Sequence, residues 1–340
     1  MKLHIVYDEI HRLHADPSGR HPSDPWRLER ALSALKASRV WELAELHRAP
    51  APSDEALLLA HEPEYLRMLE EESRHGFHYI DRDTYITEHS LTAGKAFASA
   101  TLQAVQSSLE SREPWFVMPR PGGHHAGRKG WAMGAPTLGF CLVNYAGIAA
   151  KAFLRRGLRV LALDFDAHHG NGTQDILWQD ARAVHIDIHE DGIYPGSGEV
   201  GDWGGEGAEG TKVNVPLPPF SGDREMRWAV RNVVEPIIEA FRPEAFVISA
   251  GFDAFVGDPL THMRATESSF ELFGELLRPF VGSRPLVIVL EGGYGQGLQK
   301  GLAAFFESLM GLREGGEGEE REPPHGRDVR ELLARFWGIG

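Results

Sequence analysis

Two pairs of adjacent histidines, each flanked by glycine, are the residues of this chain best suited to chemistry. The stretch PGGHHAG at 121–127 contains His124 and His125, and DFDAHHGNG at 164–172 contains His168 and His169. Imidazole can bind a metal or carry a proton near neutral pH, because its ordinary pKa is about 6.5. It can also simply fill space in a core. The question is which histidine does which.

The second pair lies beside carboxylates at a spacing that suits a metal. Side chains alternate along an extended chain, so Asp164, Asp166 and His168 would share one side and His169 would point the other way. Asp253, after another predicted strand, could supply a third ligand. Two carboxylates and one imidazole leave a coordination position open, as in catalytic zinc sites, and also suit Fe²⁺, Mn²⁺ or Co²⁺. The alternative is structural, because a buried Asp at a strand end often caps a helix or pairs with Arg.

The elements that must position these residues are strands alternating with helices. Near-continuous apolar, β-branched runs predict strands buried on both faces, at 3–7, 115–119, 159–166, 183–188, 212–217, 245–251 and 286–293. Helical periodicity predicts helices at 25–38, 90–110, 141–155, 223–241, 266–280 and 296–311, with a last short one at 327–337. This alternation favours an α/β fold with a parallel sheet. The histidine pairs, Asp253 and Tyr294 all follow strands, so they should meet at the carboxyl edge of the sheet, where ligands bind.

Composition limits the function classes. The chain has 340 residues, a net charge of -14 and one cysteine, Cys141. We therefore expect no intrachain disulfide and no direct nucleic-acid binding, since an acidic surface repels phosphates. The N-terminus does not resemble a signal peptide, and no long apolar run is present. We therefore expect a cytoplasmic protein that does not associate with membranes. The acidity could attract cationic substrates, although a solvated acidic surface is the simpler interpretation.

Eight motifs in order carry a resemblance to a known family. They are VYDEIHRLHADPSGRHPSDPWRLERA, IDRDTYIT, RPGGHHAG, GFCLVNYAGIAA, LALDFDAHHGNGTQD, HEDGIYPGSG, ISAGFDAFVGDPL and VLEGGYG. Over about residues 3–310 the chain resembles the histone deacetylase superfamily. It is most similar to class II-like bacterial and archaeal histone deacetylase-like amidohydrolases and to acetylpolyamine amidohydrolases.

The resemblance implies a single-domain arginase/deacetylase-like α/β fold with a mainly parallel eight-stranded sheet and helices on both faces. The catalytic domain would span 1–312. Residues 313–340 would form a flexible acidic link and a C-terminal helix that packs on the same domain.

The resemblance also implies roles for the polar residues. Asp166, His168 and Asp253 match the zinc ligands, and the metal would polarise an amide carbonyl and acidify a coordinated water. His125 would be the general base and then the acid. His124 would pair with Asp164, and Asn171 would orient His125. Tyr294 would donate its hydroxyl to the developing oxyanion.

The resemblance also implies residues that bind the substrate, line an exit channel or hold a monovalent cation. Phe140 and Tyr194 match the aromatic pair that flanks the substrate stem, where relatives usually have Phe in place of Tyr194. The remaining expectations are Asp83, Leu260, Gly292 and Gly293 at the substrate, Arg27 in an acetate exit channel, and a K⁺ or Na⁺ site at Asp164, Asp166, His168, Asp187 and Ile188. Relatives often have Ser where Asp187 stands. His185 and His189 are interpreted as structural, and Cys141 as a buried small hydrophobe.

The function expected is a metal-dependent amidohydrolase acting on N-acetylated primary amines, with acetyl-lysine in proteins or peptides preferred. Polyamine-selective relatives carry Glu directly after G-D-P, where this chain has Leu260. An acetylpolyamine deacetylase and a catalytically silent metal- or acyl-ligand-binding protein stay as alternatives. An arginase-like two-manganese enzyme is disfavoured, because His-His-Gly-Asn replaces a further bridging Asp. A homo-oligomer is left open.

Overall fold

A single parallel sheet organises the molecule. The computed structural model describes all residues, 1–340. The sheet contains eight strands in the order β2-β1-β5-β10-β9-β6-β7-β8, and every adjacent pair is parallel. Their bounds are β1 Leu3–Val6, β2 Ala44–His47, β5 Pro114–Val117, β6 Val160–Asp164, β7 Ala183–Glu190, β8 Lys212–Leu217, β9 Ala245–Ala250 and β10 Leu286–Leu290. A separate two-stranded antiparallel sheet joins β3 (His78–Tyr79) and β4 (Tyr85–Ile86).

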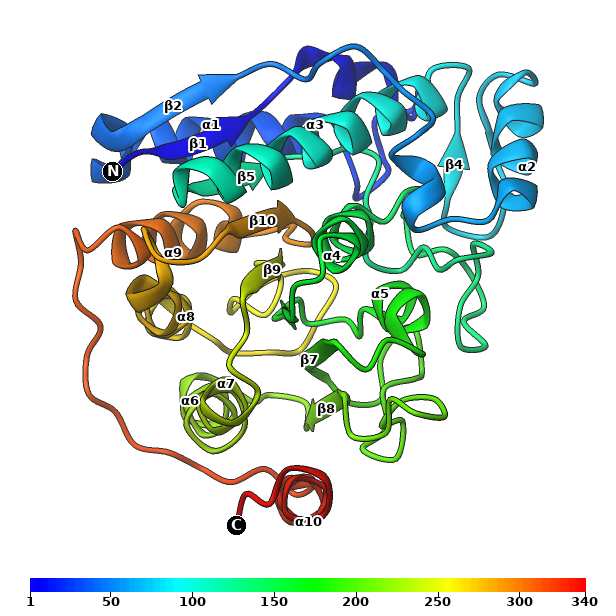
Figure 1. Cartoon of the computed structure of the whole chain (residues 1–340). Coiled ribbons are helices and arrows are strands. Elements are labelled where there is room, and N and C mark those ends of the chain that lie inside the picture. Colours follow the sequence, from blue (N-terminus) through cyan, green and yellow to red (C-terminus); the bar gives the residue numbers. More distant parts are fainter.

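Helices cover both faces of the large sheet (Figure 1). They are α1 Trp26–Ala37, α2 Pro63–Ser73, α3 Ser90–Ser111, α4 Tyr145–Arg155, α5 Asn171–Leu177, α6 Asp223–Ala229, α7 Glu235–Phe241, α8 Glu267–Leu277, α9 Lys300–Leu309 and α10 Gly326–Trp337. On one face α3 and α4 contact the central strands, and on the other α1, α8 and α9 pack together.

The strand sequences explain why both faces are covered. Along β6, Val160 and Ala162 belong to the apolar cluster on the α3–α4 side, whereas Leu161 and Leu163 belong to the cluster on the opposite side. Because successive side chains alternate between faces, a continuous apolar run is stable only when helices bury both. The α/β fold with an eight-stranded parallel sheet is therefore confirmed.

The eighth strand had no local signal. All seven predicted runs form strands, but β2, with the sequence AELH, was not predicted from its residues. It lies at the edge of the sheet and is only partly buried. Edge strands tolerate polar side chains, so apolar runs do not reveal them. Helices α2 and α5 were missed as well.

Two predicted helices differ in their bounds for physical reasons. The helix predicted from residue 141 begins at Tyr145, because the Asn144 side chain accepts a hydrogen bond from the Gly147 N–H and caps it. The helix predicted at 223–241 is interrupted by a π-helical turn at Val230–Val234. Prediction from periodicity could not detect this change of helical pitch.

The C-terminal helix packs on the same body as the rest of the chain. Residues 313–325 form a long connection without helix or strand that leads to α10 (Figure 1). Val329, Leu332 and Leu333 of α10 are buried in the large apolar cluster. The Trp337 Nε1–H donates to the Gly210 carbonyl at 2.8 Å.

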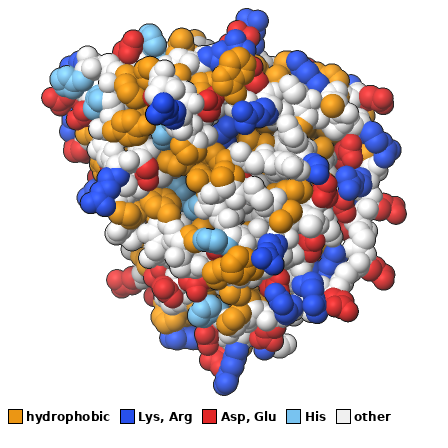
Figure 2. Space-filling model, turned by 180° about the vertical axis from the view of Figure 1, so that it is seen from behind, with side chains coloured by type: hydrophobic (Ala, Val, Ile, Leu, Met, Phe, Trp, Pro, Cys, Tyr) orange, Lys and Arg blue, Asp and Glu red, His pale blue; other side chains and the backbone are white.

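No helix combines the length and the apolar character that a bilayer crossing requires. On the face shown in Figure 2, Lys and Arg side chains are interspersed with Asp and Glu, and hydrophobic atoms gather near the middle.

Candidate active site

Four adjacent strands deliver the polar residues to one place. β5, β10, β9 and β6 lie side by side in the sheet. The segments after their carboxyl ends carry the first histidine pair, Glu291 to Tyr294, Asp253, and the second histidine pair, respectively. Parallel strands end at the same edge, so the topology brings together residues far apart in sequence. They surround a narrow cavity of about 30 Å³.

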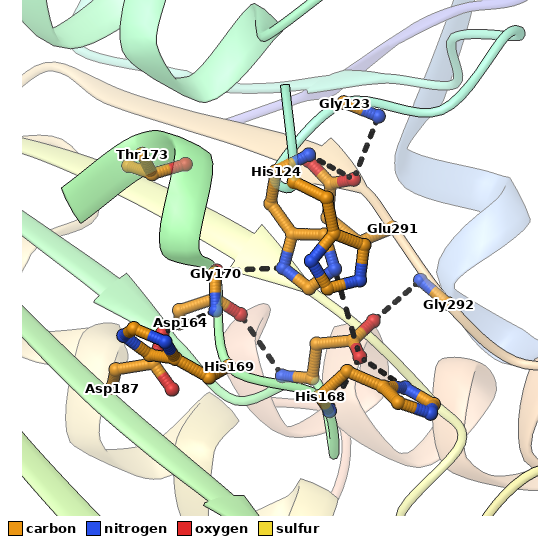
Figure 3. A network of polar contacts seen from close by, with 12 residues as sticks. Gly123, His124, Asp164, His168, His169, Gly170, Thr173, Asp187, Glu291 and Gly292 are labelled. Carbon is orange, nitrogen blue, oxygen red and sulfur yellow. Dashed lines mark hydrogen bonds and ion pairs between the residues drawn. The ribbon is translucent and has the colours of Figure 1, made fainter. Parts of the chain in front are cut away.

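Asp166, His168 and Asp253 converge in this cavity. Their ligand atoms lie within 4.8 Å of one another. The His168 Nδ1 atom lies 3.0 Å from Asp253 Oδ2 and 3.2 Å from Asp166 Oδ1. The extended backbone that the prediction assumed is wrong, because β6 ends at Asp164 and the chain then bends. The bend still sends His168 toward the carboxylates and His169 away from them (Figure 3).

The electrostatics of these three residues fit a cation. Burial and the charge of Asp166 raise the pKa of Asp253 to about 7. Although burial opposes it, Asp166 and Asp253 raise the pKa of His168 to about 10. Two buried carboxylates therefore demand positive charge between them, which a metal ion supplies.

Two glycines make room for the carboxylates. A Cβ atom on Gly251 would lie 2.2 Å from Asp166 Oδ2, and one on Gly292 would lie 2.3 Å from Asp253 Oδ2. The Gly292 N–H also donates to Asp166 Oδ2 at 2.6 Å. Any side chain at either glycine would displace a ligand, so these positions are part of the candidate metal site.

The first histidine pair is held by two different partners. His124 Nδ1 lies 3.1 Å from the Asp164 carboxylate, and His125 Nδ1 lies 2.8 Å from the amide oxygen of Asn171. Burial opposes protonation of both. The negative charges of Asp166 and Asp164 outweigh the effect of burial on His124 and raise its pKa well above the ordinary value. Burial, followed by the charges of His124 and His168, lowers the pKa of His125 well below it. One imidazole is thus suited to stay charged and the other to accept a proton.

Glu291 is a site residue whose role the sequence did not reveal. Its Oε2 atom accepts hydrogen bonds from the backbone N–H groups of His124 (3.1 Å) and Gly123 (3.3 Å) (Figure 3). Burial raises the pKa of Glu291 to about 7. The carboxylate fixes the backbone of the histidine pair. In the sequence, only its position directly after β10 and before Gly292 and Gly293 indicated that Glu291 lies at the site.

Tyr294 and Arg27 form the opposite wall. The Arg27 guanidinium lies 4.4 Å from the centre of the Tyr294 ring. Arg27 donates hydrogen bonds to the carbonyls of Gly293 (2.8 Å) and Glu291 (2.7 Å), so it fixes the backbone that carries Tyr294. Burial raises the pKa of Tyr294 well above its ordinary value, which keeps the phenol protonated and able to donate.

The aromatic residues predicted at the entrance lie near the first histidine pair. The Tyr194 ring packs edge-on against His125 with centroids 4.8 Å apart, and its hydroxyl donates to the Thr137 carbonyl. Phe140 is half-buried, and its ring lies 6.1 Å from the Tyr294 ring. Between them, Gly139 adopts a positive φ of 54°, and a Cβ there would lie 2.6 Å from both His125 and Tyr194.

Not all predicted residues line the cavity. It is lined by Ser23, Arg27, Gly122, His124, His125, Gly139, Phe140, Cys141, Asp166, His168, Asp253, Glu291, Gly292 and Tyr294. Asp83 lies outside it, and its two carboxylate oxygens accept from the hydroxyls of Thr84 (2.8 Å) and Thr137 (2.6 Å). Leu260 is half-buried, with its N–H donating to Asp258. Gly293 lies behind the cavity, packed on Leu298 and Phe252.

Of the residues predicted for a monovalent cation, Asp166 and His168 line the cavity, whereas Asp164, Asp187 and Ile188 do not. Asp164, Asp187 and His185 form a second buried group whose ligand atoms lie within 4.8 Å of one another. Asp187 also accepts from the Gly170 N–H (2.8 Å) and contacts His189 Nδ1 (2.7 Å). His169 contacts Ser197 and Gln174, and its ring centroid lies 4.9 Å from that of His189, so it packs beside this second group. Ile188 lies on β7 between the two polar positions.

Comparison with known proteins gives the family. The histone deacetylase domain model matches residues 21–309. The chain belongs to the histone deacetylase family. It is 37% identical over 298 residues to the uncharacterized protein MJ0535 of Methanocaldococcus jannaschii, covering 88% of this chain and 85% of that one. A probable deacetylase of Archaeoglobus fulgidus is 36% identical over 305 residues, with 85% and 80% covered.

A solved structure extends the similarity to the whole fold. The crystal structure of the HDA15 HD domain superposes with a TM-score of 0.88 at 31% identity, covering 99% of this chain and 95% of that one. This family comprises deacetylase-type amidohydrolases that generally use a metal ion. The chain is therefore a hydrolase of deacetylase type, with residues that could hold such an ion.

Proposed function

We propose that this protein is a zinc-dependent amidohydrolase that removes acetyl groups from N-acetylated primary amines, with acetyl-lysine in proteins or peptides as the preferred substrate. One observation carries the proposal. A three-ligand cluster, two histidines with opposite pKa shifts and a protonated tyrosine all face a single narrow cavity.

Asp166, His168 and Asp253 would hold the metal. The donor set of two carboxylates and one imidazole suits Zn²⁺, and also Fe²⁺, Mn²⁺ or Co²⁺. When bound, the ion supplies Lewis acidity, which polarises the amide carbonyl and acidifies a water molecule.

The histidine pair would move the proton. His125 is neutral, so it can remove a proton from the attacking water and return it to the leaving amine nitrogen. Asn171 holds the ring through Nδ1, which leaves Nε2 as the reacting atom. His124, charged beside Asp164, stabilises the negative charge that develops in the cavity.

Tyr294 would stabilise the oxyanion. A phenol that stays protonated can donate a hydrogen bond to the carbonyl oxygen as it gains charge. Arg27 keeps this tyrosine in place through the carbonyls on either side of Gly292.

The entrance supports an extended aliphatic substrate. Phe140 and Tyr194 are half-buried aromatics next to the reacting groups, and they would enclose a lysine stem. The position directly after G-D-P is Leu260 and supplies no carboxylate for a distal ammonium, which favours acetyl-lysine over acetylpolyamine. The net charge of -14 is an argument for the alternative, because an acidic protein attracts cationic acetylpolyamines. We further propose a cytoplasmic protein with a structural K⁺ or Na⁺ beneath the site, without nucleic-acid partners.

The test is turnover on a substrate panel. The metal-loaded chain should hydrolyse acetyl-lysine peptides faster than monoacetylated diamines, lose activity with a chelator and regain it with Zn²⁺. Faster hydrolysis of the diamines would make it an acetylpolyamine deacetylase. Tight binding of a hydroxamate without turnover of any substrate would instead identify a binding protein and overturn the catalytic proposal.

A further inference from the structure

A second cluster of metal-ligating side chains lies at the edge of the sheet, on β1 and β2. The ligand atoms of His4, Glu45 and His47 lie within 4.8 Å of one another. None of these residues lines the active-site cavity. The three side chains come from the first and second strands of the chain, whereas the active site is built after β5, β6, β9 and β10 (Figure 1).

The register of the sheet brings these residues together. In the parallel pairing, His4 lies opposite Glu45, and His47 lies two residues further along β2. Residues two apart on a strand share a face, so Glu45 and His47 point to the same side. His4 also pairs with Trp115 on its other side. The cluster thus follows from strand pairing and does not depend on loop conformation.

Glu113 and Trp115 hold the two imidazoles. His4 Nε2 lies 2.8 Å from Glu113 Oε2, so this nitrogen carries the proton and donates it to the carboxylate. The His4 Nδ1 lone pair then accepts a hydrogen bond from the His47 Nε2–H at 2.9 Å, and a bound cation would replace this proton between the two nitrogens. The Trp115 ring stacks on both imidazoles, with centroids 4.6 Å and 4.7 Å away. A carboxylate behind a histidine and a fixed ring orientation are what metal-ligating histidines require.

The distances and the access also suit an ion. Two nitrogens that each lie about 2 Å from one ion are separated by roughly 3 Å, which is close to the observed separation. The His47 side chain is 24% exposed and that of Glu45 is 55% exposed, so an ion can reach the cluster from solvent. Two imidazoles and a carboxylate favour late first-row divalent cations.

We propose that His4, His47 and Glu45 form a second divalent-cation site, of the Zn²⁺ type, that fastens the edge strand β2 to β1. Glu113 is its positioning residue. A cation that binds the folded chain but not the unfolded chain stabilises the fold by mass action. The site would therefore protect β2, an edge strand whose side chains are only partly buried.

The experiment counts zinc on the full chain. Metal-stripped protein is titrated with Zn²⁺ by calorimetry, and bound zinc is measured after gel filtration. His47→Gln should bind one equivalent less than the natural chain and lose the corresponding zinc-dependent rise in melting temperature. Glu113→Gln should weaken that binding phase roughly 10-fold. His89→Gln, at an exposed histidine outside the cluster, should behave like the natural chain.

The comparison is between variants, so it does not depend on whether the active site is loaded. Glu45→Gln, at the most exposed ligand, repeats the test if His47→Gln folds poorly. Equal zinc content and equal zinc-dependent stabilisation in the natural chain and in both ligand variants would overturn the proposal.

Discussion

The Nδ1 atom of His125 lies 2.8 Å from the amide oxygen of Asn171, so a neutral group orients the imidazole that is placed to carry the proton. His124, in contrast, has a carboxylate at Nδ1. An amide fixes the ring orientation without adding charge, which leaves the pKa of His125 low. The different partners separate the two histidines into a charged member and a basic one.

Replacing the amide with a carboxylate should change the pH dependence of catalysis. In Asn171→Asp, the added negative charge favours protonated His125 and should raise its pKa by roughly 1 unit or more. Activity requires the neutral form, so the acidic limb of the kcat/KM profile should move to higher pH. A pH–rate profile on an acetyl-lysine peptide measures this, and an acidic limb at the same pH in both proteins would contradict it.

Stability provides a control for that substitution. The Asn171 Nδ2 group donates to the Ala132 carbonyl at 2.9 Å, and Asp cannot make this hydrogen bond when ionised. We expect a loss of about 1–3 kcal/mol in the free energy of unfolding. The profiles must therefore be recorded well below the melting temperature of the variant.

Removing the Tyr294 hydroxyl should abolish most turnover without loss of metal. Tyr294→Phe keeps the ring beside Arg27 but removes the donor for the oxyanion. Loss of one such donor costs roughly 10²–10³ in kcat. Steady-state kinetics and zinc analysis measure the two effects. Tyr79→Phe, at an exposed tyrosine on β3, should leave kcat unchanged. Full activity of Tyr294→Phe would contradict the proposed mechanism.

Glu291 should affect kcat by positioning the histidine pair. Glu291→Gln retains one oxygen acceptor but brings a donor NH₂ group close to the backbone N–H groups of Gly123 and His124. We expect kcat to fall roughly 10-fold, with a smaller change in KM. A variant with the natural kcat would show that the carboxylate is dispensable.

The sequence predicts those parts of the site that depend on strand ends. Asp166, His168 and Asp253 could be placed together, because buried parallel strands have apolar sequences and their carboxyl ends meet. The local backbone could not be predicted, since β6 ends at Asp164 where extended structure was assumed. His168 reaches the carboxylates through a bend, for which the residues after Asp164 give no periodic signal.

Residues that act through the backbone are harder to predict. Glu291 holds two N–H groups from a segment 168 residues away in the chain. Such a contact depends on the strand order β5-β10, which the sequence does not specify. The edge strand β2 was missed for a related reason. It is a strand because it pairs with β1, and its amino-acid composition gives no indication of this.

Lys212 should make the stability of the fold depend on pH. This side chain is fully buried at the start of β8, and its Nζ group donates to the Ala183 carbonyl (2.9 Å) and the Thr211 hydroxyl (2.6 Å). Burial lowers the pKa of Lys212 to about 7. In the unfolded chain the same group titrates near its ordinary value of about 10.4. Between these values the unfolded chain binds a proton that the folded chain does not, so the free energy of unfolding should rise with pH.

Replacing Lys212 removes this contribution. In Lys212→Met, the free energy of unfolding should rise less steeply between pH 7 and pH 9.5, by up to about 1.4 kcal/mol per pH unit. Urea unfolding across this range measures the slope. Lys129→Met, at a side chain that is 76% exposed, should leave the slope unchanged. Equal slopes in the natural chain and Lys212→Met would show that Lys212 stays protonated when buried, held by the carbonyl and hydroxyl oxygens around it.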